Sequence, residues 1–124
     1  MVDLSIGVDI VSIGRMENIL NSKKGTRFKH RIFTASEIVY CQNRGRNASH
    51  HFAGRFAAKE AVKKAILSKG ENQNPWFKKI EIQSRQDGAP IVRLPKPYQS
   101  NYHCECSISH DGDSAIAFAL IQKK

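Results

Sequence analysis

The chain of 124 residues contains no apolar run close to the roughly 20 residues that a membrane-spanning helix requires. Its N-terminus also lacks a basic segment followed by an apolar core, so no secretory signal is visible. We therefore expect a cytoplasmic protein with no membrane partner. No linker, internal repeat or low-complexity stretch interrupts the sequence, and we expect a single domain over residues 1–124.

Cysteines are few, and their odd number, three, argues against a framework of disulfides. Cys104 and Cys106 alternate along an expected strand with His103 and His110 nearby. A structural metal site usually needs four ligands in paired clusters, so we interpret these cysteines as small buried hydrophobic residues. Acidic residues are also scarce: 11 Asp and Glu stand against 20 Lys and Arg, for a formal net charge of +9. Such a charge attracts phosphates, nucleic acids, anionic membranes or acidic proteins, and does not choose among them.

The order of apolar and turn patterns predicts an α+β fold, in which an antiparallel sheet packs on a long central helix. The sheet is expected to combine an N-terminal strand with two C-terminal hairpins. Thr34 and Glu37 have the spacing of a capping box that opens one of the shorter helices. The expected elements are a strand at 3–13, helices at 15–20, 34–42 and 51–68, and hairpins over 78–94 and 105–121.

Two carboxylates lie in segments that are otherwise apolar. Asp9 interrupts the N-terminal strand, and Glu60 interrupts the central helix. A buried, ionised carboxylate is costly unless it is paired or holds a metal. Asp9 could be satisfied by backbone N–H groups, and Glu60 could pair with Lys64 one turn later. Mg²⁺ also fits, because it prefers one or two carboxylates with phosphates and water. Gly7, on the same side of the strand as Asp9, leaves room for a ligand to approach.

Basic residues at helical spacing follow the central helix. Arg55, Lys59 and Lys63 succeed one another at i, i+4 steps, as either a solvated helix face or a row of phosphate ligands about 12 Å long at 1.5 Å per residue. At the expected tip of the last hairpin, Ser109, His110 and Asp111 could bind phosphate or move a proton, although turn chemistry accounts equally well for the aspartate.

Three segments together resemble the holo-acyl-carrier-protein synthase family of small 4′-phosphopantetheinyl transferases. The resemblance covers nearly the whole chain, and its second segment matches the family signature nearly residue for residue. After that segment the family usually carries a Gly-Thr-Gly-like sequence, where this chain has Ile66-Leu-Ser-Lys-Gly70. The matching segments are Ile6-Gly-Val-Asp-Ile10 with Arg15, Phe52 to Ala65, and Cys106-Ser-Ile-Ser-His110 with Ala115-Ile-Ala-Phe-Ala119.

The resemblance implies an enzyme that transfers 4′-phosphopantetheine from coenzyme A to a serine of apo acyl carrier protein and releases adenosine 3′,5′-bisphosphate. It implies that Asp9 and Glu60 hold Mg²⁺ and act in catalysis with Lys64. Two residues could accept the proton of the serine: Glu60, through a metal-bound water, and Asp111. We favour Glu60. The implied coenzyme A ligands are Arg55, Lys59, Lys64, Ser109 and His110, and the implied carrier-protein contacts are Arg15, Arg27, Phe28 and Arg31.

The same resemblance implies a homotrimer with active sites between subunits. Two alternatives from other classes are weighed against it. A small basic nucleic-acid-binding module would fit the net charge, but it explains neither carboxylate, and no such motif is present. We therefore expect no nucleic-acid partner. A coenzyme A-binding protein without catalytic activity would bind the nucleotide without turnover.

Overall fold

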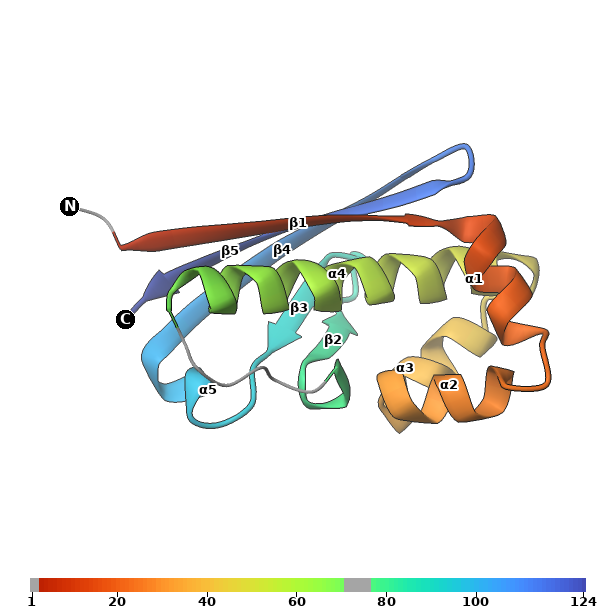
Figure 1. Ribbon diagram of the computed structural model, residues 1–124, viewed down its shortest axis with the longest axis horizontal. Helices are drawn as coiled ribbons and strands as arrows, with labels where there is room; N and C mark the ends of the chain where they lie inside the picture. The colour runs from red at the N-terminus through yellow and green to blue at the C-terminus, as the bar shows by residue number, and fades with distance from the viewer. Residues whose placement is uncertain (1–2, 71–76) are drawn as a thin grey trace.

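The computed structural model describes residues 3–70 and 77–124, and its main feature is an antiparallel sheet packed along one long helix (Figure 1). The sheet has the strand order β1-β5-β4. The helix, α4, is 21 residues long and contacts all three strands. The predicted α+β fold with a long central helix is thus confirmed. These elements are β1 (Leu4–Ser12), β4 (Tyr102–Asp111), β5 (Ser114–Lys123) and α4 (Ala48–Ser68).

Small residues bring the sheet and α4 close together. Ala61 on α4 and Ala117 and Ala119 on β5 are fully or almost fully buried at this contact. A Cβ atom added at Gly7 of β1 would lie only 1.9 Å from the carbonyl oxygen of Ala61. The space beside Gly7 is therefore filled by the backbone of α4, and the predicted room for a ligand at this position is wrong. Cys104 and Cys106 pack against the same core, as expected.

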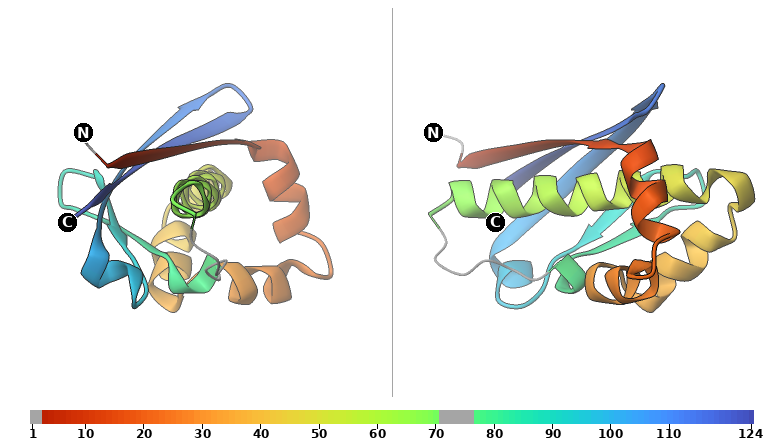
Figure 2. Two further views of the ribbon diagram at one scale, coloured as in Figure 1. Left: turned by 60° about the vertical axis from the view of Figure 1, so that its left-hand side comes forward. Right: turned by 45° about the vertical axis from the view of Figure 1, so that its right-hand side comes forward.

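Three short helices gather around the first half of α4 (Figure 2). Their core is aromatic, with Phe33 and Phe52 in edge-to-face contact at 5.0 Å between ring centroids. The predicted capping box is confirmed: Thr34 accepts from the backbone N–H of Glu37, and the Glu37 carboxylate accepts from the backbone N–H of Thr34. The helices are α1 (Ile13–Leu20), α2 (Gly25–Ile32) and α3 (Ala35–Gln42), and the 3-10 turn η1 (Gly45–Asn47) joins α3 to α4.

The first hairpin forms a second, two-stranded sheet rather than joining the first one. It was expected to lie in the main sheet. Ile82 of this hairpin is buried in the same core as the residues of α4, so the hairpin packs its apolar face on the helix as a separate sheet. No helix within the described residues is both long and apolar enough to cross a membrane. The elements are η2 (Phe77–Lys79), β2 (Glu81–Ser84), β3 (Pro90–Arg93) and α5 (Tyr98–Asn101).

Candidate active site

Asp9 and Glu60 line the same pocket, which has a volume of about 360 Å³. Asp9 enters from β1 and Glu60 from α4, and their side chains are 18% and 26% exposed. Apolar side chains supplied by α1, α2 and α4 form the rest of the wall, among them Met16, Phe28 and Phe56. The pocket therefore combines two half-buried acids with a hydrophobic wall, as a site that binds a charged and an apolar group side by side requires.

Each carboxylate has a lysine of α4 as its neighbour. Lys64 Nζ lies 3.1 Å from Asp9 Oδ1 and also donates to the Val8 carbonyl at 3.0 Å. Lys63 Nζ lies 4.0 Å from Glu60 Oε1. The pair between Glu60 and Lys64, which the helical spacing allowed, is replaced by the pair between Lys64 and Asp9. Lys64 thus pairs with one of the two carboxylates that line the pocket, and its ammonium offsets part of the negative charge there.

The donors at this pocket fit a hard divalent cation. Carboxylate oxygens are the ligands that Mg²⁺ prefers, and two of them leave most of an octahedral shell for substrate phosphate and water. Over residues 3–70 and 77–124, no group of three or more His, Cys, Asp or Glu side chains could hold a metal ion. The described part of the chain therefore supplies two carboxylates at most, and a bound cation would complete its shell with phosphate oxygens or water.

A second group of polar side chains lies around Tyr40 of α3. The guanidinium of Arg55 stacks on the Tyr40 ring at 3.9 Å from its centroid, and the guanidinium of Arg44 lies 4.0 Å from the same centroid. Arg55 Nη2 donates to Ser84 Oγ at 2.7 Å, while its buried Nε has no hydrogen-bond partner. A hydrogen bond with Ser84 and the two arginines lower the pKa of Tyr40.

Histidines extend this cationic group toward the tip of the last hairpin. His110 Nε2 lies 3.0 Å from the His50 carbonyl, and the His110 ring lies 6.4 Å from that of His51. Gly54 makes room for this arrangement, because a Cβ there would lie 3.0 Å from His110 Nε2. Burial first, and then the charges of Arg55 and Arg44, lower the pKa of His51. The positive charge of the cluster therefore comes from the two arginines, and the charged form of His51 is disfavoured.

Ser109 does not lie in this cluster, although its neighbour in the sequence, His110, does. In β4, His110 is paired with the buried Ala115 of β5, whereas Ser109 is paired with the exposed Ile116. Side chains alternate between the faces of a sheet, so Ser109 lies on the outer face, away from α4. The structure thus separates two residues that the resemblance placed together at the nucleotide. Asp111 is exposed at the hairpin tip and does not line the carboxylate pocket.

The row of basic residues on α4 is mostly buried. Arg55 is 5% exposed and stacks on Tyr40, and Lys63 Nζ lies 3.8 Å above the centroid of the Phe77 ring. Lys59 is fully buried, and its Nζ lies 2.7 Å from Glu37 Oε1. The structure therefore contradicts the prediction that Lys59 binds a coenzyme A phosphate, because its charged group is inaccessible and already paired.

Four residues of the cationic cluster were missed at the sequence level: Tyr40, Arg44, His51 and Ser84. Tyr40, His51 and Ser84 come from three separate elements, which meet only in the folded chain, and Arg44 lies in the turn between α3 and η1. The spacing of an aromatic and a basic residue four positions apart, Tyr40 and Arg44, is only a weak signal of such a cluster, since these pairs are common on surfaces.

The arginines expected at the carrier protein lie apart from this cluster. Arg15 is on α1, and Arg27 and Arg31 are on α2; all three are exposed.

Comparison with known proteins supplies the family. The model of the 4′-phosphopantetheinyl transferase superfamily matches residues 5–119. The chain belongs to this superfamily. A holo-[acyl-carrier-protein] synthase from Chlorobaculum parvum is 41% identical over 119 residues, which cover 96% of this chain and 98% of the relative.

Solved structures of this transferase superfamily match the fold as well. A structure of the Helicobacter pylori holo-[acyl-carrier-protein] synthase in complex with coenzyme A is 36% identical, with a TM-score of 0.77 over 96% of this chain and 99% of that one. A coenzyme A complex from Chronobacterium ammoniagenes is 28% identical, with a TM-score of 0.83 over 98% of both chains.

Proposed function

We propose that this transferase moves 4′-phosphopantetheine from coenzyme A to a serine of apo acyl carrier protein and releases adenosine 3′,5′-bisphosphate. The observation that carries the proposal is the pocket shared by Asp9 and Glu60, which has an apolar wall. Glu60 lies on the same helix, α4, as the buried Arg55. The names of the relatives support the same activity. The reaction breaks the diphosphate P–O bond on the pantetheine side, and the serine oxygen takes the bisphosphate's place on that phosphorus.

The cationic cluster around Tyr40 and the carboxylate pocket would bind different parts of coenzyme A. Arg55, with Arg44 and His110, would hold phosphate at the nucleotide end, since all three are cationic or polar groups of one cluster. Lys64 pairs with Asp9, from which its ammonium could pass to a phosphate oxygen and stabilise charge in the transition state. Mg²⁺ held by Asp9, Glu60 and the diphosphate would neutralise charge on the leaving group.

Glu60 is the better-placed base for the serine proton. It lines the pocket together with Arg15 and Phe28, two of the residues proposed to meet the carrier. Asp111 lies outside that pocket, at the tip of the last hairpin. A base has to lie within hydrogen-bond reach of the proton it accepts, directly or through one water. We therefore assign the proton to Glu60, through a water molecule.

A homotrimer is part of the proposal, and the outer face of the main sheet supports it. Six large apolar side chains there are between 40% and 65% exposed. A contiguous exposed apolar surface of this kind usually marks an interface. Ser109 lies on this same face, so a second copy packed there would bring Ser109 next to a neighbouring subunit. The six residues are Leu4, Ile6, Val8, Ile10, Ile116 and Phe118.

Incubation with coenzyme A, Mg²⁺ and an apo acyl carrier protein, followed by intact-mass measurement of the carrier, tests the proposal. The expected result is a carrier heavier by one 4′-phosphopantetheine group and free adenosine 3′,5′-bisphosphate. Binding of coenzyme A without a mass change of the carrier would indicate a binding protein without transferase activity. The absence of both coenzyme A binding and a mass change would contradict the proposed function altogether.

A further inference from the structure

Lys59 and Glu37 form an ion pair that is almost completely closed to solvent, and the proposed reaction does not use it. We infer that this pair is a positioning device: it holds Phe77 against Phe56, which lines the carboxylate pocket, and holds Ser84 beside Arg55. Lys59 and Glu37 themselves do not touch the substrate. The inference rests on the proposed function, because what is positioned is the proposed coenzyme A site.

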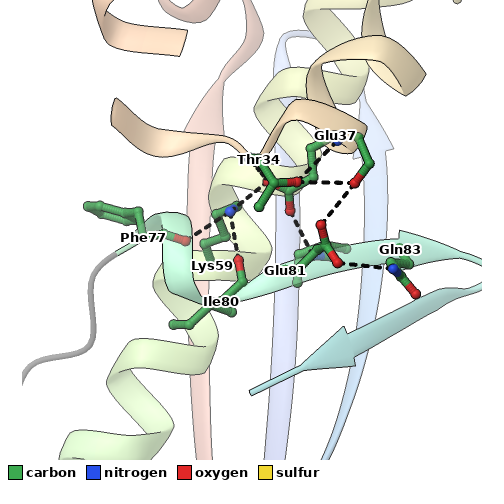
Figure 3. A network of polar contacts seen from close by, with 9 residues as sticks. Thr34, Glu37, Lys59, Phe77, Ile80, Glu81 and Gln83 are labelled. Carbon is green, nitrogen blue, oxygen red and sulfur yellow. Dashed lines mark hydrogen bonds and ion pairs between the residues drawn. The ribbon is translucent and has the colours of Figure 1, made fainter. Parts of the chain in front are cut away.

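The ammonium of Lys59 has a full set of acceptors (Figure 3). Its Nζ lies 2.7 Å from Glu37 Oε1 and donates to the carbonyls of Phe77 and Ile80 at 2.8 and 2.6 Å. An ammonium has three donors, and these partners use all of them. Lys59 therefore ties α4 to α3 on one side, and to the first residue of η2 and to Ile80 directly after η2 on the other.

The carboxylate of Glu37 is equally engaged. Its Oε1 accepts from the backbone N–H of Thr34 at 2.7 Å, and its Oε2 accepts from the backbone N–H of Ile82 at 2.7 Å. One carboxylate thus closes the N-terminus of α3 and fixes the middle of β2. Together the two side chains connect α3, α4, η2 and β2, four elements that are otherwise in limited contact.

One arm of this connection leads to the carboxylate pocket. Lys59 fixes the backbone of Phe77, whose ring stacks on Phe56 at 5.3 Å between centroids. Phe56 lines the pocket with Glu60. Lys63 Nζ lies over the Phe77 ring at 3.8 Å and 4.0 Å from Glu60 Oε1. The position of Phe77 thus bears on both the apolar wall and the lysine beside Glu60.

The other arm leads to the cationic cluster. Glu37 fixes β2 at Ile82, and Ser84, two residues later in the same strand, accepts the hydrogen bond from Arg55. Glu37 also caps the N-terminus of α3, which carries Tyr40, the ring on which Arg55 stacks. Both contacts that orient the Arg55 guanidinium therefore depend on elements that Glu37 holds.

The cost of the pair favours a positioning role over a purely stabilising one. Replacing a buried ion pair by apolar or neutral groups of similar size is often neutral or stabilising, whereas removing one partner is strongly destabilising. Burial lowers the pKa of Lys59, and the neighbouring Glu37 acts in the opposite direction. A pair kept in a dry core for directional hydrogen bonds to four elements is explained by the geometry that it imposes.

The test is the double variant Lys59→Met/Glu37→Gln, which removes both charges together. We expect it to unfold near the wild-type temperature, while either single change that leaves a buried charge unfolds well below it. We also expect the Kd and KM for coenzyme A to rise about 10- to 100-fold, as for small misplacements of binding groups. The KM for the carrier should hardly change, because Arg15 and Arg27 lie on elements the pair does not touch. A control is Asp3→Asn/Lys69→Met, which removes a different lysine–carboxylate pair, between the residue before β1 and the C-cap of α4.

A stable double variant with wild-type affinity for coenzyme A would overturn the inference, as would equal losses toward both substrates. If the double variant does not fold, Ser84→Ala decides, because it removes only the contact between β2 and Arg55. We expect that variant to be stable and to bind coenzyme A several-fold more weakly; unchanged binding would also overturn the inference. Failure of the wild-type protein to bind coenzyme A would instead count against the proposed function.

Discussion

Gly7 shows how a single missing side chain sets the distance between two elements. A Cβ there would meet the carbonyl oxygen and carbon of Ala61 at 1.9 and 2.9 Å. Both atoms belong to the backbone of α4, which cannot turn aside as a side chain can. The close approach of β1 and α4 that this allows is what brings Asp9 and Glu60 to one pocket.

Gly7→Ala should therefore separate β1 from α4 and destabilise the protein by about 3 kcal/mol, at the upper end of the usual range for overpacking. Urea unfolding followed by circular dichroism measures the change. Gly45→Ala is the control: Gly45 has a φ of 58° but open space around it, so only the roughly 1–2 kcal/mol of a left-handed alanine is expected. Equal losses in the two variants would show that the close contact is not the cause.

Asp113 connects the tip of the last hairpin to the start of α1. Its carboxylate accepts from Ser12 Oγ and from the backbone N–H of Gly14, both at 2.7 Å. These hydrogen bonds, that from Ser12 first, lower its pKa from the ordinary value of 3.8. A lowered carboxyl pKa contributes stability above the unfolded value, and this contribution is lost as the pH falls through the folded value.

Asp113→Asn should thus lower the free energy of unfolding at pH 7, and the difference from the wild type should shrink as the pH falls below about 4. Urea titrations at several pH values, with the exposed Asp111→Asn as a control, measure this dependence. A difference that grows toward acid pH would mean that the Asp113 carboxylate does not stabilise this junction.

Sequence patterns predicted single residues well where the chemistry is local. The capping box of Thr34 and Glu37 needs only a spacing of three residues, and both features are present. The two carboxylates stood out because each interrupts an apolar pattern. Lys59 was misinterpreted because helical spacing shows which residues share a ridge, and does not show which other segment covers it. The partner that buries Lys59 is Glu37, 22 positions earlier in the chain, and no pattern around either residue indicates the pairing.

At the scale of elements, α1 and α2 present basic residues next to the carboxylate pocket. Arg15 lines that pocket, and Arg27 lies beside Phe28, another lining residue. Charges at the rim of an interface steer encounter and are screened over about 8 Å at physiological salt. An acidic carrier protein should therefore be attracted to this surface, while coenzyme A should be bound mainly by the cluster at α3, α4 and β2.

Charge reversal by Arg15→Glu or Arg27→Glu should raise the KM for the carrier about tenfold or more and weaken its dependence on salt. The KM for coenzyme A should hardly change. Steady-state kinetics at two salt concentrations separate these effects, with Lys124→Glu as a control away from both helices. Equal losses toward both substrates would place these arginines at coenzyme A, or reveal a folding defect.

The element order along the chain was predictable, but the grouping of strands was not. Turn residues such as Asp87-Gly88 mark a hairpin locally, and β2 and β3 do form one. Whether that hairpin joins the main sheet depends on its tertiary contacts, and here its buried face packs on α4 while Glu37 fixes β2. Such information lies in tertiary contacts and not in periodicity.

At the scale of the whole molecule, the main sheet has one face on α4 and one apolar face toward solvent. The exposed apolar residues lie on β1 and β5. Within residues 3–70 and 77–124, no other element covers this face. Burial of apolar surface contributes about 25 cal/mol per Å², so a second copy gains most by packing on this face.

Light scattering at micromolar concentration should therefore give the mass of a trimer. Ile6→Lys should shift it toward the monomer and reduce transfer, because a charge placed in an apolar interface is not compensated. The exposed Val39, on α3 and outside this face, gives a control in Val39→Lys. A fully active wild-type species of monomer mass would contradict the trimer and any role for this face in the reaction.

The most direct test of the whole account is the Mg²⁺ dependence of transfer by Asp9→Asn and Glu60→Gln, measured by the mass of the carrier. Both carboxylates are assigned to one cation, so each variant should lose most of its transfer at every Mg²⁺ concentration while circular dichroism shows an intact fold. Asp3→Asn, at the other end of β1, should behave as the wild type. Near-normal turnover by either variant at low Mg²⁺ would contradict the account.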